Sequence, residues 1–265
     1  MTNMQRIQLQ PAYVIFQRPF RDSSAIVEIF TENFGRCALV ARGIKRPSSK
    51  YRGLLQPFRL LLLSWVSKGE LGTLTDVEFH GYAPSIKPKY LPSAFYLNEL
   101  VQYLLHRDDP HEDLFTGYHE AIETLQQLSG AKNDELLLQA CLRQFELMLL
   151  QSIGYGLNLD SNADTHDPIV KHVDYYYVID HGPVDVANKP GHGQGCVVSG
   201  EALQLLANEN LMWQAARDLC EENRLLFKEA KQLLRTTIDY HLGSRPLHSR
   251  DLYIDTGSVQ NTPST

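Results

Sequence analysis

Hydrophobic and polar residues follow two different periods along the chain. Up to about residue 80, short runs rich in β-branched and aromatic residues alternate with turn material such as "TENFG" and "SKGE". The runs are "AYVIFQR", "SAIVEIFT", "GRCALVARG", "RLLLLSWV" and "LGTLTDVEF". Such runs are typical of strands. Five of them in so short a segment predict a small barrel of the oligonucleotide-binding (OB) type, because closure removes exposed strand edges.

The period becomes helical after "HGYAPSIKPKYLPS", where three prolines mark a junction. Apolar residues recur at helical spacing from Leu97 to Leu105 and again from Leu114 to Leu125. A third helix is predicted from an N-cap at Asn133 to Gly154, and it is apolar nearly all round. The pattern therefore predicts a helical bundle with this third helix buried at its centre.

The helical period is interrupted at residues 158–198, where "VDYYYVID" predicts a strand and "NKPGHGQGC" a loop. It returns after Ser199, a suitable cap for "GEALQLLANE", and in one long helix from about Trp213 to a glycine stop at Gly243. The sequence thus predicts an α+β protein in two parts: an OB-fold barrel at 1–80 and a mainly helical bundle domain at 81–250. The irregular region, 158–198, is predicted to be a zinc-loop-like insertion in the helical domain. A flexible C-terminal tail is predicted at 251–265.

Composition adds a compartment and a charge asymmetry to this picture. No apolar run approaches the length of a membrane span and no leader pattern precedes the first strand, so we expect a cytoplasmic protein. The net charge is −6, yet residues 1–80 carry 11 Lys and Arg against 6 Asp and Glu. A basic part fused to an acidic one suggests that the barrel meets a polyanion.

The basic charge is concentrated in one window without acidic residues, 33–69. Its middle, "RGIKRPSSKYRG", is predicted as a loop between strands. Lysine and arginine there would neutralise phosphates, and nearby aromatic residues (Phe34, Tyr51, Phe58 and Trp65) would offer faces for bases. The alternative is a solvated basic loop with its aromatics in the barrel core. The candidate nucleic-acid-binding residues are Arg36, Arg42, Lys45, Arg46, Lys50, Arg52 and Arg59.

Two further groups of polar residues have weaker patterns. A candidate second anion stripe lies on one face of the last helix, with a solvated outer face as its alternative: Arg224, Lys228, Lys231 and Arg235. Histidines gather in the irregular region near Cys196, but they lack the short paired spacing of structural zinc ligands: His166, His172, His181 and His192. The sequence predicts no metal, no cofactor and no catalytic residue.

Several stretches together resemble the RecO family of bacterial recombination mediators. They are "FTENFGRCALVARGIKR", "YRGLLQPF", "LLLSWVSKGELGTLTDVE", "LRQFELMLLQSIGYGLNL" and "HLGSRPLHSR", in order over nearly the whole chain. The resemblance implies a non-catalytic protein of DNA repair and recombination. Such proteins bind single- and double-stranded DNA, anneal strands coated by single-strand-binding protein, and act with RecR to load RecA. Many relatives carry paired cysteines for zinc at the region matching 158–198, where this chain has only Cys196.

The resemblance also implies that the helical domain docks the acidic, phenylalanine-ending tail of single-strand-binding protein. Such a tail needs a cation and an apolar pocket. The candidate cation is Arg143, and the candidate walls are Leu147, Tyr155 and Leu157. The alternative is that Arg143 forms an internal pair with a carboxylate such as Glu146 or Glu99. Two other function classes stay open: a metal-dependent enzyme built on the four histidines, and a pure protein adaptor.

Overall fold

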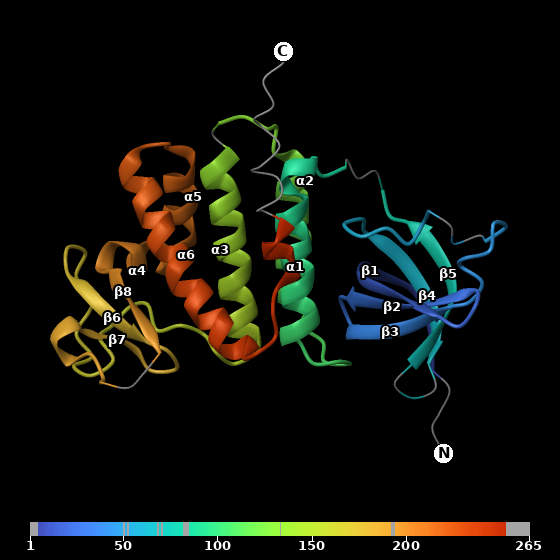
Figure 1. Cartoon of the computed structure of the whole chain (residues 1–265), viewed down its shortest axis with the longest axis horizontal. Coiled ribbons are helices and arrows are strands. Elements are labelled where there is room, and N and C mark those ends of the chain that lie inside the picture. Colours follow the sequence, from blue (N-terminus) through green and yellow to red (C-terminus); the bar gives the residue numbers. More distant parts are fainter. Residues whose placement is uncertain are drawn as a thin grey trace, which may run out of the picture. The chain divides into compact units, whose positions relative to one another are not determined.

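A computed structural model describes residues 5–49, 51, 53–67, 69, 71–81, 85–132, 134–191 and 194–252 (Figure 1). The chain forms two compact units: residues 1–126 with 247–265, and residues 127–246. Among the described residues, no helix is long and apolar enough to cross a membrane.

The first unit begins with a closed five-stranded barrel in the order β1-β2-β3-β5-β4. Its strands are β1 (Gln5–Phe20), β2 (Ser24–Thr31), β3 (Gly35–Ala41), β4 (Leu61–Ser67) and β5 (Leu71–Phe79). The pair β3–β5 is parallel and the other pairs are antiparallel. This is the strand arrangement of an OB fold, so the fold predicted from the sequence is confirmed.

The length of β1 allows the barrel to close. Its first half pairs with β4 and its second half with β2, and Ala12 faces a partner on both sides. The register of β1 shifts at two places. One lies between Ile7 and Gln10 in the pairing with β4, and the other lies between Val14 and Phe16 in the pairing with β2. Leu9 has a φ of 49° at the first of them. Bulges of this kind turn a strand around a barrel corner.

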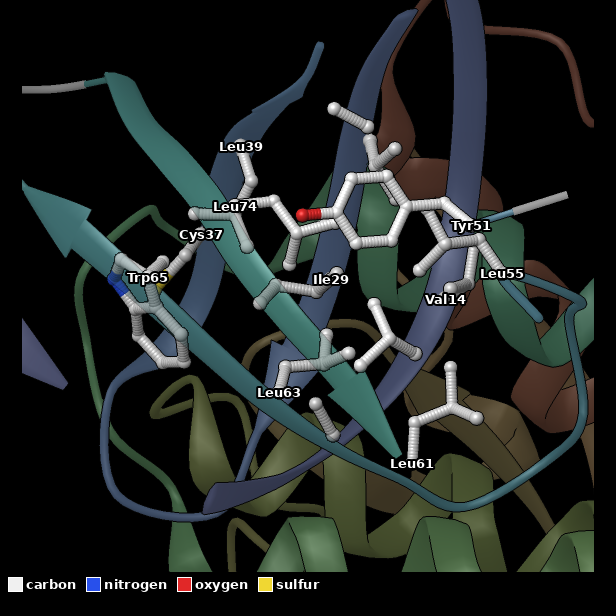
Figure 2. Close-up of a cluster of buried hydrophobic side chains, with 14 of the residues drawn as sticks. Val14, Ile29, Cys37, Leu39, Tyr51, Leu55, Leu61, Leu63, Trp65 and Leu74 are labelled. Atoms are coloured by element: carbon white, nitrogen blue, oxygen red, sulfur yellow. The ribbon is translucent and has the colours of Figure 1, made fainter. Parts of the chain in front are cut away.

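The barrel interior is filled by apolar side chains from all five strands and from the loop between β3 and β4 (Figure 2). Val14, Ile29, Leu61 and Leu63 are almost fully buried. Tyr51, from the loop, is also buried, and its hydroxyl donates to the carbonyl of Thr75 at 2.9 Å. The long loop therefore contributes to the core as well as to the surface.

Two helices complete the first unit: α1 (Leu91–Leu104), preceded by the short 3-10 turn η1 (Pro88–Tyr90), and α2 (Glu112–Gln127). Asn98 joins both helices to the barrel. It donates to the carbonyl of Ile15 at 2.9 Å and accepts from the Tyr118 hydroxyl at 2.5 Å. The 3-10 turn η3 (His248–Arg250) returns to α1 near the C-terminus.

The second unit combines helices with a small sheet. Helix α3 (Asp134–Ser152) packs against α5 (Glu209–Arg217) and α6 (Glu221–Leu242), and α4 (Gly200–Ala207) packs against α5 and α6 (Figure 1). Strands β6 (Asp174–Val178), β7 (Gly182–Asp185) and β8 (Gly195–Ser199) form an antiparallel sheet in the order β7-β6-β8. The turn η2 (Val186–Asn188) follows β7.

Three expectations about these elements have clear outcomes. Ser199 caps α4 by accepting from the amide of Ala202 at 3.1 Å, and Gly243 ends α6 with a φ of 61°, as predicted. The single long helix predicted from Trp213 is wrong: α5 ends at Arg217, and α6 starts anew with Cys220 as its cap. The predicted cap Asn133 lies outside the described residues.

Candidate nucleic-acid interface

Exposed basic side chains gather at the end of the barrel where β3 ends. Arg42, Lys45 and Arg46 follow β3 directly and are exposed. The amide of Lys45 donates to the carbonyl of Ser23 at 3.1 Å, and its Nζ lies 3.5 Å from the carbonyl oxygen of Arg21. These bonds hold the loop against the turn between β1 and β2. The turn and the loop therefore present their cations together, and we call this surface, made by Arg21, Arg42, Lys45 and Arg46, the basic end.

Arg21 is a member of this surface that sequence reasoning missed. It is exposed, with a φ of 52°, and its guanidinium lies over the ring of Phe20, 5.1 Å from the centroid. The residue lies outside the acid-free window because Asp22, Glu28 and Glu32 stand between it and residue 33. The available signal was the stretch "FQRPFR", in which each of two phenylalanines is followed within two positions by an arginine.

Arg36 lies at the opposite end of β3. It is six positions from Arg42 along the extended chain, a distance of about 20 Å. Its side chain is 15% exposed, donates to the carbonyl of Gln102 in α1, and lies 3.9 Å from the buried carboxylate of Glu28. Glu28 also pairs with Arg107. Arg36 therefore joins the barrel to α1, and we leave it out of the basic end.

The remaining lysines and arginines predicted to bind nucleic acid fall into two groups. Arg59 is half-buried, and its guanidinium lies 5.5 Å from the ring centroid of Phe79, a ring that is 45% exposed. It is a cation at the barrel surface, but the structure gives no bond that joins it to the basic end. Lys50 and Arg52 lie outside the described residues.

The aromatic residues expected to stack on bases are mostly core residues. Tyr51 and Trp65 are buried in the barrel core (Figure 2). Phe58 is also buried, and Phe34 packs edge-on against Trp65 at 5.5 Å between ring centroids. For these side chains the core alternative holds. For Tyr51 and Trp65 the physical reason is that small barrels fill their interior with large side chains, whereas Phe58 is covered by Phe95 of α1.

In the second unit, the structure separates the residues predicted to dock a protein tail. Arg143 is buried in α3 and pairs with Glu146 at 2.6 Å, which is the internal pair left open as the alternative. Leu147 is half-buried one turn further along the helix. Tyr155 and Leu157, in contrast, line one pocket of about 380 Å³ together with residues of β6 and α6.

This pocket has polar as well as apolar walls. Tyr155 is 48% exposed and stacks on the imidazole of His241, with 3.9 Å between ring centroids. Nε2 of His241 lies 3.4 Å from a carboxylate oxygen of Asp180, a lining residue. Burial lowers the pKa of His241, against the opposing effect of Asp180. The pocket therefore offers an aromatic surface beside a weakly basic group.

The candidate anion stripe on α6 is partly neutralised within the unit. Arg224 lies 3.4 Å from Glu135, and Arg235 lies 3.6 Å from Asp239. Lys228 and Lys231 are exposed on the same helix. These pairs favour the alternative of a solvated outer face with local partners.

The histidines of the irregular region do not form a metal cluster in the part of the chain that the structure describes. His181 pairs with Asp164 at 3.1 Å, and His166 and His172 are exposed. Cys196 is buried in β8, and burial raises the pKa of its thiol, which disfavours the thiolate that binds zinc. His192 lies outside the described residues, so the absence of a metal stays a prediction.

Fold and basic end together define the class of this protein: a two-part α+β protein built on an OB-fold barrel with a cationic end. The N-terminal part, residues 4–83, matches the family model "Recombination protein O N terminal", and residues 88–251 match "Recombination protein O C terminal". The chain therefore belongs to the RecO family.

Curated relatives support the same assignment over nearly the full length. The chain is 42% identical over 247 residues to a protein of Nitrosococcus oceani, covering 93% of each chain. It is 40% identical over 248 residues to one of Alkalilimnicola ehrlichii, covering 94% of this chain and 91% of the relative. Both relatives are named DNA repair protein RecO.

Proposed function

We propose that this protein is a non-catalytic recombination mediator in DNA repair, which binds and anneals single-stranded DNA in the cytoplasm. The observation that carries the proposal is the basic end, where two separate loops bring exposed cations together. Such clusters neutralise phosphates and release counterions. The names of the relatives support a role in DNA repair. Within that role, we propose that the protein acts with RecR and helps RecA to load on strands coated by single-strand-binding protein.

Binding to DNA should depend steeply on salt. If three or four phosphates are engaged, the plot of log K against log salt concentration should have a slope of about −2 to −3 for single strands. Replacing Arg42, Lys45 and Arg46 together with alanine should flatten this slope. The variant makes fewer phosphate contacts, so its binding releases fewer counterions. Titration of a fluorescent oligonucleotide at several salt concentrations measures it.

The matched control for this variant is a second triple replacement, Arg224, Lys228 and Arg235 to alanine, which removes the same charge from α6. We expect it to leave the slope close to that of the unmodified protein. A normal slope in the barrel variant and a flattened one in the helix variant would move the DNA site to the second unit.

We further propose that the tail of single-strand-binding protein docks at the second unit, with its terminal phenylalanine in the pocket of Tyr155 and Leu157. The pocket supplies apolar and aromatic surface, which such a side chain requires. Arg143 was expected to bind the terminal carboxylate, but its pairing with Glu146 makes a structural role the stronger interpretation.

The alternative functions are separated by simple measurements. A pure protein adaptor would show no salt-dependent binding of DNA in the titration above. For a metal-dependent enzyme, elemental analysis of protein purified without chelator should give near-stoichiometric metal. We expect none, because the described histidines are not clustered.

A further inference from the structure

An apolar groove of about 890 Å³ lies in the first unit, beside the second half of β1. Its walls are β1, the segment 55–57 of the long loop, α1, and the chain around η3. The lining is rich in aromatic rings and side-chain amides, notably Phe16, Gln17, Gln56, Phe95, Gln102 and Tyr103. This volume is at the upper end of the range for small-molecule sites, so it has room for more than one flat ring.

The register of β1 places three of its residues on one face. Phe16 pairs with Glu28, Arg18 with Ile26, and Phe20 with Ser24. Between them, Gln17 pairs with Val27, which belongs to the barrel core. Successive residues of a strand point to opposite faces, so Phe16, Arg18 and Phe20 lie on the outer face. An aromatic residue, a cation and a second aromatic residue therefore follow one another along the outside of the barrel.

This face connects the groove to the basic end. Phe16 lines the groove and is 42% exposed, and Phe20 lies under the guanidinium of Arg21. Four residues of strand span about 14 Å. A strand of nucleic acid held by its phosphates at the basic end can therefore reach the groove within a few nucleotides.

The chemistry of the groove suits bases better than phosphates. Phe16 and Phe95 expose about two fifths of their surface, and Phe95 is braced edge-on by Phe58, with ring centroids 5.0 Å apart. Of the described lining residues, Glu99 is the only carboxylate, and it already accepts from the backbone amides of His248 and Ser249. A groove with aromatic and amide walls, whose one described carboxylate is already hydrogen-bonded, offers stacking faces and hydrogen bonds to bases but no cation for a phosphate.

We propose that this groove takes unstacked bases of single-stranded DNA, with Phe16 and Phe95 as stacking faces and Arg18 as a contact for the intervening phosphate. The proposal rests on the proposed DNA binding and adds a specificity to it. In a duplex the base faces are covered by their neighbours, so only an open strand can use the groove. The basic end would bind both forms of DNA, and the groove would favour the single strand.

The test compares Phe16→Ala with the unmodified protein on a thymidine oligonucleotide and on a duplex. Loss of one stacking face should weaken binding of the single strand about tenfold, and duplex binding should change little. The slope against salt should stay the same, because stacking releases no counterions. Arg18→Ala should instead reduce the slope by about 0.7, the contribution of one phosphate.

Two controls make the result specific. Phe16→Leu keeps apolar bulk but removes the aromatic face, so it should behave like Phe16→Ala. Full binding of the single strand by Phe16→Leu would overturn the proposed stacking. Leu225→Ala removes a comparably exposed side chain from α6 and should have no effect. Equal losses on single strand and duplex would also overturn the proposal. Failure of the unmodified protein to bind either DNA would sink the proposed function itself.

Discussion

At the scale of single residues, the second unit contains a buried ion pair that the sequence left ambiguous. The side chains of Arg143 and Glu146 are 4% and 1% exposed, and Arg143 also lies 3.3 Å from the side-chain oxygen of Gln139. A lone arginine on an apolar helix needs either an internal partner or a ligand. Since Glu146 is one turn away on the same helix, the internal partner is the simpler explanation.

We therefore predict that Arg143→Ala costs about 3–5 kcal/mol of unfolding free energy, because it leaves the carboxylate of Glu146 buried without its cation. Urea unfolding measures this loss. The double variant Arg143→Met, Glu146→Leu removes both charges and should recover most of it. Tyr155→Ala is the companion variant: it should weaken binding of a phenylalanine-ending acidic peptide while stability is kept. Normal stability of Arg143→Ala together with tenfold weaker peptide binding would return Arg143 to the docking site.

His241 should make stability depend on pH. Burial lowers its pKa in the folded protein, so the unfolded chain binds a proton more readily. The unfolding free energy should therefore fall as the pH drops through the ordinary histidine pKa of about 6.5. Unfolding at pH 7.5 and pH 5.5 tests this. Asp180→Asn should enlarge this loss of unfolding free energy, and His241→Gln should reduce it. The control variant is His172→Gln, because His172 is exposed. An equal fall in the His241 variant would contradict the assignment.

At the scale of elements, α1 holds the returning chain near the C-terminus through one carboxylate. Glu99 accepts from the amide of His248 at 3.0 Å, from the amide of Ser249 at 2.9 Å, and from the Ser249 hydroxyl at 2.5 Å. Ser249 is buried at this contact. The contact explains why residues from Leu247 onward group with the first unit rather than with α6, which precedes them.

We predict that Glu99→Ala releases η3 from α1. Three donors lose their acceptor, which should cost about 1–3 kcal/mol and expose the backbone near His248 to proteases. Limited proteolysis followed by mass spectrometry reports the site of cleavage. Glu99→Gln keeps one acceptor oxygen and should give an intermediate rate. Unchanged cleavage in the alanine variant would show that packing of Leu247 is sufficient.

At the scale of the whole molecule, charge is divided more finely than into a basic and an acidic part. The barrel segment 1–80 has a net charge of +5, but residues 81–126, which complete the first unit, carry three Lys or Arg against seven Asp or Glu. Four of these seven carboxylates lie on α2, so the basic barrel shares its unit with one acidic helix. A phosphate chain would be attracted to the barrel and repelled by α2.

This division predicts an effect on association with DNA. Glu112, Asp113 and Glu120 are exposed on α2, and replacing them with glutamine or asparagine should raise the association rate a few-fold at low salt. Near 0.5 M salt the gain should vanish, because charges are then screened within a few ångströms. Stopped-flow measurements separate association from dissociation, which should not change. A gain that persists at high salt would indicate a direct contact instead.

The sequence by itself determined the periodic elements and the family. The five strands, the α1 to α3 region and the caps at Ser199 and Gly243 follow from local hydrophobic period and turn chemistry, which act over a few residues. The basic character of the barrel follows from composition. The break between α5 and α6 and the short strands β7 and β8 were not predicted. Local propensity is weak in these segments, so tertiary packing selects their secondary structure.

Only the tertiary structure decided which residues act together. Arg36 and Arg42 are close in sequence but sit at opposite ends of a strand, while Arg21 joins the basic end across a backbone hydrogen bond from Lys45 to Ser23. Barrel closure turned Tyr51 and Trp65 inward, and packing of α1 on β1 and of η3 on α1 placed these elements around one groove. A site is a set of side chains gathered from distant segments, and their convergence depends on strand register and barrel closure. Sequence patterns report local propensity, so they name the candidates but not their neighbours.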